Sequence, residues 1–192
     1  MSSIVIAGNT SGAITIAAPA EAGLNTLTLP ASTGTVALTS TAVQTHLTTT
    51  SSQSNTANTR TNISGLNATI TPSTTSKRIK ITIRWNGEHS NASNRNQLFG
   101  IKRDTTDIGN PAAAGSRPVG MAIIAVNYLN DATSTPDSAT YTYIDSPATT
   151  SATTYHATYL ALNGGTLYNQ RTVLDSGTAE RLTSNIILEE ID

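Results

Sequence analysis

Hydrophobic and polar residues alternate along most of the second half of the chain. From Arg78 to Trp85, isoleucine or tryptophan occupies every second position, and Arg, Lys or Thr lies between them. A repeat of two residues is that of a β-strand with one buried and one solvated face. The same alternation predicts further strands at 97–102, 119–128, 139–144, 153–162, 165–169 and 185–191.

Turn-forming residues separate these segments. Glycine, asparagine, serine and proline gather at 86–87, 109–111, 134–137, 146–147 and 163–165. Such residues favour tight turns. Roughly seven or eight short strands between residues 77 and 192 indicate an all-β fold, an antiparallel β-sandwich with the jelly roll as its leading topology.

The first 38 residues carry shorter alternating segments. Apolar residues alternate or cluster at 4–6, 14–16, 27–29 and 35–38, with Gly, Asn or Pro between these stretches. They predict a small β-module of about four strands over residues 1–38. So short a module is too small to be stable alone, and we expect it to pack against another protein.

Residues 39–76 differ from both neighbours, because 20 of these 38 residues are Ser or Thr. Hydroxyl side chains compete for the backbone, so the segment is a poor helix former and is interpreted as a linker. Alternatively, Ile63, Leu66 and Ile70 have the spacing of core positions in a coiled coil. One or two helical turns would then close a three-fold axis.

Charge follows the same division. Up to Ser76 only Glu21 and Arg60 are charged, whereas 11 acids and 10 bases lie from Lys77 onward. A domain boundary is therefore expected near residue 76. The net charge of −1 and the lack of a basic run make nucleic acid and anionic membranes poor partners.

Composition changes the picture in three ways. Only 37% of the residues are hydrophobic and 12% are charged, so some apolar burial is expected to come from other copies of the chain. Cysteine is absent, which excludes disulfides, thiolate metal sites and thiol catalysis. The N-terminal residues lack the basic and continuous apolar stretches of a signal peptide or membrane span, so assembly in a cytoplasm is expected.

No motif supplies positioned catalytic groups, so the chain is expected to be no enzyme and to hold no cofactor or metal. His46, His89 and His156 are scattered, without metal-ligand spacing. Asp104 and Asp107 flank a turn, where aspartate caps the turn or, alternatively, binds a cation.

The acidic residues near the C-terminus allow two interpretations. Glu189, Glu190 and Asp192 are interpreted as solvated carboxylates. Alternatively, copies of them gather around a three-fold axis, where like charges need a cation or an arginine.

Two further groups are candidate contact residues. The polar stretch 88–96 is a candidate receptor loop, in which a host sugar would contact His89, Asn91, Asn94, Arg95 and Asn96. Tyrosines alternate along two predicted strands, as in aromatic ladders at subunit interfaces. The candidate trimer-interface residues are therefore Ile63, Leu66, Ile70, Tyr141, Tyr143, Tyr155 and Tyr159.

Four segments carry a family resemblance. GNTSGAITIAAP at 8–19 and GLNTLTLPASTGTV at 23–36 resemble a short module that recurs in virion proteins of tailed bacteriophages. YIDSPATTSATTY at 143–155 and TSNIILEEI at 183–191 are similar to the globular tip domain of fibre-type proteins from marine and freshwater phages.

The resemblance implies a surface protein of the phage particle, assembled in the host cytoplasm as a homotrimer with a sandwich tip. Residues 1–38 would then anchor the chain to other virion proteins, and residues 77–192 would face outward, where they can meet a host cell-surface glycan. The linker is too short for the extended shaft of a long tail fibre. A short tail fibre, a head fibre and a capsid decoration (cement) protein that stabilises the head lattice all stay open.

Overall fold

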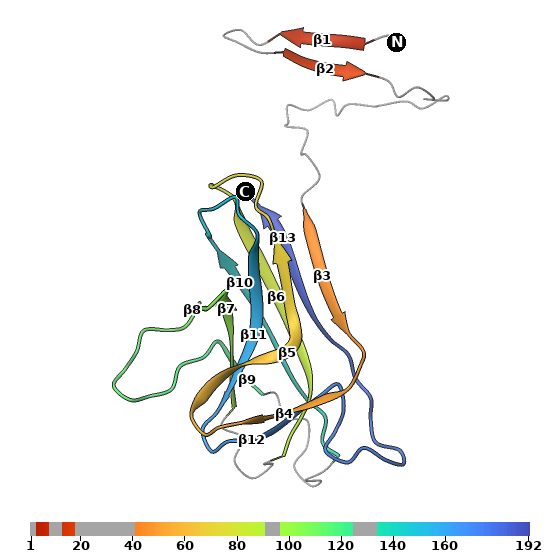
Figure 1. Ribbon diagram of the computed structural model, residues 1–192, viewed down its shortest axis with the longest axis vertical. Coiled ribbons are helices and arrows are strands. Elements are labelled where there is room, and N and C mark those ends of the chain that lie inside the picture. Colours follow the sequence, from red (N-terminus) through yellow and green to blue (C-terminus); the bar gives the residue numbers. More distant parts are fainter. Residues whose placement is uncertain (1–2, 8–12, 18–40, 91–96, 125–133) are drawn as a thin grey trace. The chain divides into compact units, whose positions relative to one another are not determined.

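The computed structural model describes residues 3–7, 13–17, 41–90, 97–124 and 134–192 (Figure 1). All the regular elements in these ranges are β-strands. By its internal contacts the chain divides into two compact units, residues 1–38 and 39–192. Over the described ranges, no helix is long and apolar enough to cross a membrane.

The first unit contains one described hairpin. Strand β1 (Ser3–Ala7) pairs antiparallel with β2 (Ala13–Ala17), from the pair Ser3 and Ala17 to the pair Ala7 and Ala13. These two strands were predicted. The strands predicted at 27–29 and 35–38 lie outside the described residues.

The second unit is a sandwich of two antiparallel sheets. The first sheet is built from β3 (Ala42–Leu47), β4 (Ser51–Asn55), β6 (Arg78–His89), β10 (Asp137–Asp145), β12 (Gly165–Asn169) and β13 (Ser184–Ile191). The second sheet is built from β5 (Thr59–Ile70), β7 (Gln97–Arg103), β8 (Thr106–Ile108), β9 (Ala122–Ile123) and β11 (Thr153–Ala161). The predicted all-β sandwich is confirmed.

The strand order is that of a jelly roll. Strands β12 and β13 pair with successive parts of β6, and β4 and β3 pair with them in turn. Strands β8 and β9 likewise share one edge of β7. We count β3 with β4, β8 with β9, and β12 with β13 as one strand each, which gives eight strands numbered in chain order. The first sheet then has the order 1-8-3-6 and the second sheet the order 2-7-4-5. Apart from the hairpin of β7 and β8, neighbouring strands in each sheet are far apart in the chain, and only long-range pairing brings them together.

The core lies between the two sheets, and β6 supplies its centre. Ile79, Ile81, Ile83 and Trp85 are fully buried, as the alternation predicted. The Trp85 ring lies 5.0 Å, centroid to centroid, from the ring of Phe99 on the facing sheet. Burial of each such side chain contributes roughly 1.5–3 kcal/mol, so this one strand anchors the sandwich.

The expected linker at 39–76, and with it the boundary near residue 76, is wrong. Residues 42–70 form β3, β4 and β5, which belong to the sandwich. Threonine is β-branched and favours strands, and hydroxyl side chains suit the solvated side of an edge strand. A Ser/Thr-rich segment is thus compatible with a strand whenever another strand offers it a ladder of hydrogen bonds.

The coiled-coil alternative is wrong as well. Strand β5 carries an irregularity where its register against β11 shifts, so that residues 63–66 lie opposite a single intervening residue, Ala157. Gly65 adopts the left-handed backbone conformation there, with φ +75°. The extra residues reverse the alternation, so Ile63 and Leu66 both enter the core although they are three positions apart. The bulge therefore mimics helical spacing.

The predicted turn at Asn86 and Gly87 is also wrong, because β6 continues through both residues to His89. A Cβ atom at Gly87 would lie only 2.0 Å from the backbone oxygen of Tyr168 on β12. The glycine thus permits a close approach of two strands. Of the strand predicted at 119–128, the described part contains only β9, and residues 125–128 lie outside the described ranges.

Candidate functional site

The sandwich has two chemically different ends. At one end, called the base, β3 begins beside the C-terminus, and the Glu190 amide donates a hydrogen bond to the Thr41 oxygen at 2.9 Å (Figure 1). Strand β10 also ends at the base, where Asp145 pairs with Ile79. At the opposite end, called the loop end, β4, β6, β9 and β11 end, and the excursion between β12 and β13 begins there.

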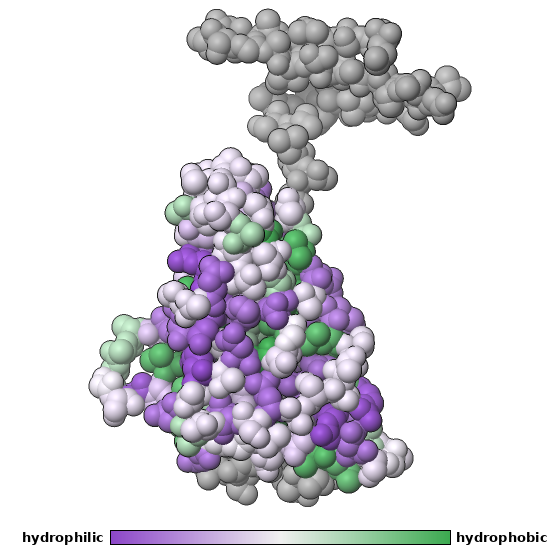
Figure 2. Space-filling model, viewed as in Figure 1, coloured by the Kyte–Doolittle hydropathy of each residue, from purple (hydrophilic) through white to green (hydrophobic). Residues whose placement is uncertain are grey.

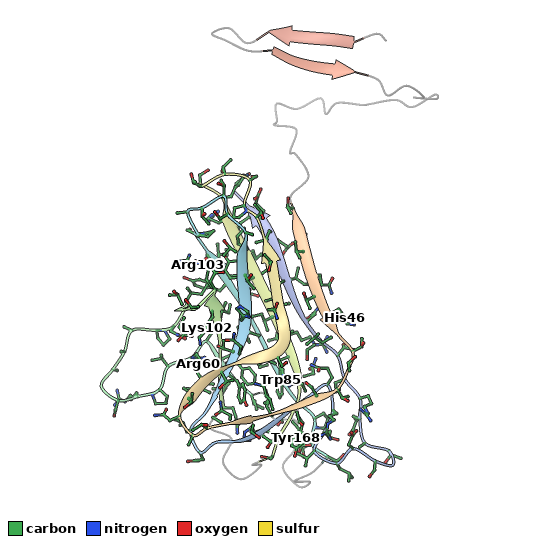
Figure 3. The ribbon with its side chains drawn as sticks, viewed as in Figure 1. His46, Arg60, Trp85, Lys102, Arg103 and Tyr168 are labelled. Atoms are coloured by element: carbon green, nitrogen blue, oxygen red, sulfur yellow. The ribbon has the colours of Figure 1, made fainter. Side chains whose placement is uncertain are left out.

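A buried layer of polar side chains lies toward the loop end. The indole Nε1 of Trp85 donates to Asn169 Oδ1 at 2.8 Å, and Asn169 Nδ2 donates to Ser51 Oγ at 3.2 Å. Figure 3 shows Trp85 and Tyr168 in this region and Arg103 nearer the base. The layer joins β6, β12 and β4 through side chains, so it holds the strands that carry the loops in fixed positions.

Residues 170–183 form an excursion between β12 and β13, and polar side chains hold its two ends. The backbone amide of Gln170 donates to the backbone oxygen of Asn86 at 3.0 Å, and the backbone amide of Asn86 donates to Ser184 Oγ at 2.9 Å. Gln170 Nε2 donates to the same Ser184 oxygen at 2.8 Å. The Ser184 hydroxyl therefore bonds the backbone of β6 at Asn86, just beyond the last residue of β6 that pairs with β13.

Charged and aromatic side chains stabilise the excursion. The Arg171 guanidinium lies 4.5 Å above the centre of the Tyr168 ring, a cation–π contact. The Asp175 carboxylate accepts ion pairs from Arg171 at 3.4 Å and from Arg181 at 2.6 Å. Glu88 Oε2 accepts a hydrogen bond from the Val173 amide at 2.7 Å. The excursion is thus a built, ordered part of the loop end.

Of the five candidate receptor residues, only His89 lies in the described part of the chain. His89 is only 3% exposed and its Nδ1 lies 3.0 Å from Gln97 Nε2, so the prediction that its side chain contacts a receptor is wrong. His89 is the last residue of β6, and its side chain is buried in the sandwich. Asn91, Asn94, Arg95 and Asn96 lie outside the described residues, so their part of the prediction stays a prediction.

The candidate trimer-interface residues belong to the core of the single chain. Those that are less than 10% exposed are Ile63, Leu66, Ile70, Tyr141, Tyr155 and Tyr159. Tyr143 is half-buried and packs against the same core. A side chain enclosed within one chain offers no surface to another copy, so this assignment is wrong for the six buried residues.

The buried tyrosines instead tie the sheets together. The Tyr141 hydroxyl donates to the Gly100 oxygen at 3.0 Å, and the Tyr155 hydroxyl donates to Asp145 Oδ2 at 2.8 Å. The same carboxylate accepts contacts of 3.1 and 2.9 Å from Arg103 Nη1. Burial raises the pKa of Tyr159 to about 12, and burial also raises the pKa of Tyr141 and Tyr155. All three stay protonated donors near neutral pH.

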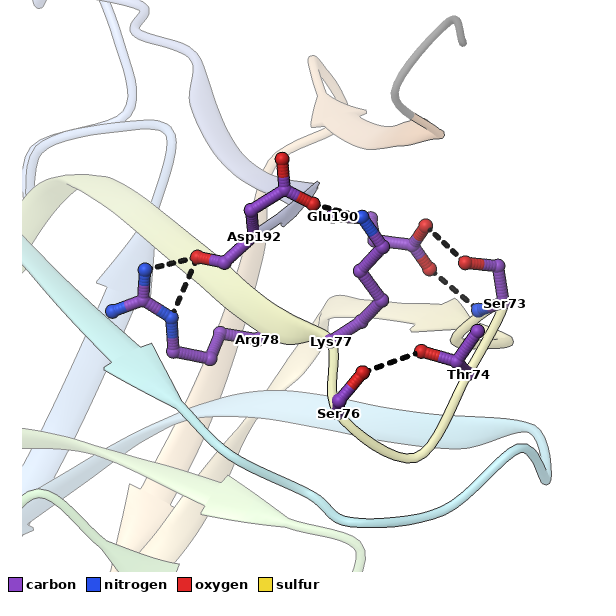
Figure 4. A network of polar contacts seen from close by, with 7 residues as sticks. All are labelled: Ser73, Thr74, Ser76, Lys77, Arg78, Glu190 and Asp192. Carbon is purple, nitrogen blue, oxygen red and sulfur yellow. Dashed lines mark hydrogen bonds and ion pairs between the residues drawn. The ribbon is translucent and has the colours of Figure 1, made fainter. Parts of the chain in front are cut away.

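The carboxylates near the C-terminus differ in their surroundings (Figure 4). Glu190 is only 7% exposed, so its interpretation as a solvated carboxylate is wrong, whereas the Asp192 side chain is 96% exposed, as that interpretation predicted. Glu189 lies 2.7 Å from Lys80 Nζ, and Asp192 accepts from Lys77. The side chain and backbone nitrogen of Ser73 both donate to Glu190. The contacts of Ser73 and Lys77 fasten the connection between β5 and β6 to the end of the chain at the base, whereas the pair of Lys80 and Glu189 joins β6 to β13.

The turn aspartates also bind protein groups. Asp104 lies in the tight turn between β7 and β8 with φ +52°, and its Oδ1 accepts from the Thr154 amide at 3.0 Å. Asp107 lies 3.7 Å from Arg60 Nε. In the described part of the chain, no three His, Cys, Asp or Glu side chains are grouped so that they could hold a metal ion.

The outer surfaces of the two sheets differ. Over the second sheet, Arg60 donates to Thr158 Oγ1 at 3.1 Å and to the Val119 oxygen, and burial lowers its pKa. In Figure 2 the surface over β5 and β11 is dominated by hydrophilic residues. On the first sheet, by contrast, β13 places Ile187 and Ile191 at outward positions, where both are half-buried. A signal in the sequence was the run Ile186, Ile187, Leu188, which breaks the alternation.

Neither the protein-family models nor the curated proteins contain a match to this chain.

Proposed function

We propose that this chain is a non-enzymatic structural subunit on the surface of a tailed-bacteriophage particle, a short homotrimeric fibre of the tail or head. In this proposal residues 1–38 are the anchor that binds other virion proteins. The sandwich is exposed on the particle surface and contacts the host cell.

The observation that carries this proposal is the polarity of the sandwich. The chain enters it at the base, beside Glu190, whereas β4, β6, β9 and β11 end at the loop end. A virion protein that holds residues 1–38 is thereby tethered to the base and leaves the loop end accessible. Recognition is commonly carried by loops on a rigid scaffold, which fits this arrangement.

The sequence of the first unit supports the anchoring role. Glu21 is the only charged side chain among residues 1–38. The paired strands β1 and β2 leave their outer edges without a partner in the described part of this unit. Few charges and open strand edges suit a permanent contact with another protein. The resemblance of segments 8–19 and 23–36 to a phage virion module points the same way.

A second candidate function is that of a capsid decoration protein, and the finding that the expected linker is part of the sandwich favours it. Because residues 42–70 belong to the sandwich, the spacer that would separate a fibre tip from its anchor is absent from residues 41–76. A subunit without a spacer suits a cement protein that lies flat on a capsid lattice. Copy number separates the two functions, since a fibre occurs in tens of chains per particle and a decoration protein in hundreds.

The anchoring role is tested by deletion of residues 1–38. The truncated chain should be absent from purified particles, while its far-ultraviolet spectrum stays that of a folded β-protein. The variant Asn94→Ala, in the candidate receptor loop, should be incorporated normally. If the truncated chain is still found on particles at normal copy number, the anchor lies in the sandwich and the proposed arrangement is wrong.

A further inference from the structure

The connection between β8 and β9 contains an exposed segment, residues 111–118, here called the arm. All eight of its residues are exposed, which is the longest such run in the part of the chain that the structure describes. The next longest, residues 174–178, lies in the excursion, where Asp175 accepts ion pairs from Arg171 and Arg181. Figure 1 shows the connection between β8 and β9 projecting away from the sheets. The arm is therefore open to solvent along its whole length.

The arm also lacks the hydrogen bonds that hold a backbone in place. Among the described residues, its single hydrogen bond joins the Arg117 amide to the Ala114 oxygen at 3.4 Å, which is long for such a bond. A Cβ atom added at Gly115 would meet nothing within 4 Å. A backbone without partners takes up an extended conformation at little cost, and the active-site cleft of a protease requires that conformation of its substrate.

The residues on both sides of the arm are fastened to the sandwich. The Met121 amide donates to the Phe99 oxygen at 2.7 Å, and Arg60, on β5, donates to the Val119 oxygen. A Cβ atom at Gly109 would lie only 3.0 Å from the Met121 side chain, so the two ends of the connection also pack against each other. A protease can therefore reach the arm without separating any strands.

The sequence of the arm, PAAAGSRP, selects the kind of protease. Three consecutive alanines, residues 112–114, offer small side chains to the small specificity pocket of an elastase-like serine protease. A trypsin-like pocket needs Lys or Arg, and the only such residue of the arm, Arg117, is followed by Pro118, whose ring hinders cleavage of the bond between them. The arm thus fits a protease that cuts after small residues.

The position of the arm in the strand order decides what a cut would do. Apart from the hairpin of β7 and β8, every ladder described in the sandwich pairs a strand before the arm with a strand after it. Core contacts cross the arm in the same way, since the Phe99 and Tyr141 rings lie 6.4 Å apart, centroid to centroid. The two pieces of a cut chain would share one hydrophobic core and stay joined without a peptide bond between them.

From these observations we propose that the arm is the site at which a protease of small-residue specificity cuts the folded chain, and that the cut chain keeps its fold. In the reaction, water adds to the carbonyl carbon of Ala112, Ala113 or Ala114, and the C–N bond to the next residue breaks. The piece before the cut gains a carboxylate, and the piece after it gains an amino group. In the proposed virion subunit, residues 1–38 belong to the first piece, so pairing across the arm would keep the second piece on the particle.

The test is limited digestion of the full chain with pancreatic elastase under native conditions. Mass spectrometry of the denatured products should place the first cut within residues 41–192 after one of the three alanines at 112–114. The cut sample should elute from a size-exclusion column at the volume of the uncut chain, with an unchanged far-ultraviolet spectrum, although a denaturing gel separates the two pieces. Trypsin under the same conditions should leave the bond between Arg117 and Pro118 intact.

Two variants separate the preference for small residues from exposure. The combined variant Ala112→Glu, Ala113→Glu and Ala114→Glu should be cut in the arm at least about ten times more slowly, because a long charged side chain does not enter a small pocket. Ala152→Glu, at an exposed alanine between β10 and β11, is the control and should be cut in the arm at the unchanged rate.

Each part of the proposal has its own contrary outcome. A first cut elsewhere in residues 41–192, or a sandwich that elastase leaves whole, contradicts the arm as the cutting site. An unchanged rate in the combined variant contradicts the preference for small residues. Pieces that separate or unfold after a cut in the arm contradict the retained fold. Incorporation of the chain into particles is not measured in this experiment, so the proposed function stands or falls separately.

Discussion

Glu190 accepts two hydrogen bonds from Ser73, one on each carboxylate oxygen and both at 2.6 Å, although 117 positions separate the residues. The bonds from the Ser73 hydroxyl and amide hold the pKa of Glu190 below its ordinary value of 4.5, against an opposing effect of burial. The charged carboxylate thus joins the connection between β5 and β6 to β13 at the base of the sandwich.

This contact predicts a pH-dependent stability. Because the pKa is lower in the folded chain, the contribution is fully present above about pH 4.5 and is lost as the pH falls through the folded pKa. Glu190→Gln should lower the free energy of unfolding at pH 7 by about 1 kcal/mol. Urea unfolding at pH 7 and at progressively lower pH checks this, because the difference in stability between the variant and the unchanged chain should shrink as the pH falls below 4.5. Glu189→Gln, which alters a half-exposed pair, should change stability at pH 7 by less.

Gly87→Ala should prevent normal folding of the loop end. The added Cβ would lie 2.0 Å from the Tyr168 oxygen and 2.8 Å from the Trp85 ring, so β6 and β12 would have to separate. We expect a loss of more than about 3 kcal/mol in unfolding free energy. Gly115→Ala is the control, since its Cβ would meet nothing within 4 Å and costs only the strain of its φ of +64°. Equal stabilities for the two variants would contradict the close approach.

The Asp145 carboxylate should contribute more to the free energy of unfolding than its position at the end of β10 suggests. It is 8% exposed and accepts from Arg103 and Tyr155. Asp145→Asn should cost about 2 kcal/mol, and Tyr155→Phe about 1 kcal/mol. Denaturant unfolding of both variants and of the double variant checks the coupling. Strictly additive losses would argue against a shared contact.

Ile63→Ala and Leu66→Ala should each lower the stability of the sandwich by about 2–5 kcal/mol, because both side chains are fully buried. Thermal unfolding measures the loss, and Ser64→Ala, at an exposed position between them, is the control. A coiled-coil role would instead weaken association and leave the sandwich intact. That result would contradict the bulge in β5.

A fragment of residues 39–192 should fold, whereas a fragment of residues 77–192 should not. The shorter fragment lacks β3, β4 and β5, including four core residues of β5, namely Ile63, Leu66, Ala68 and Ile70. Far-ultraviolet spectra and thermal unfolding of both fragments check this. A cooperative transition in the 77–192 fragment would place the domain boundary back near residue 76.

Local pattern predicted much of the strand content. The alternation around Ile81 gave the centre of the core, because period two directs the same side chains inward whatever the partner strand. The glycine-rich turn after β11 was equally readable, since Gly164 adopts the left-handed conformation with φ +68°. These features depend on residues close together in the chain.

Other features were decided by distant strands. Nothing near Ser73 indicates that Glu190 will bind it, and nothing near Gly87 distinguishes a turn from a close approach to Tyr168. The same applies to the contact candidates, because an aromatic ladder has the same spacing in a core as at an interface. Burial of Tyr155 and Tyr159 depends on which sheet faces them.

The sequence by itself therefore determined that the chain is all-β and which residues of its strongest strands point inward. Only the tertiary structure decided that residues 42–70 are strands, because Ser and Thr gain their ladder partners from β11, β12 and β13. Side-chain period is a local property of the backbone. Pairing is a free-energy balance between segments more than 100 residues apart, and no local pattern records it.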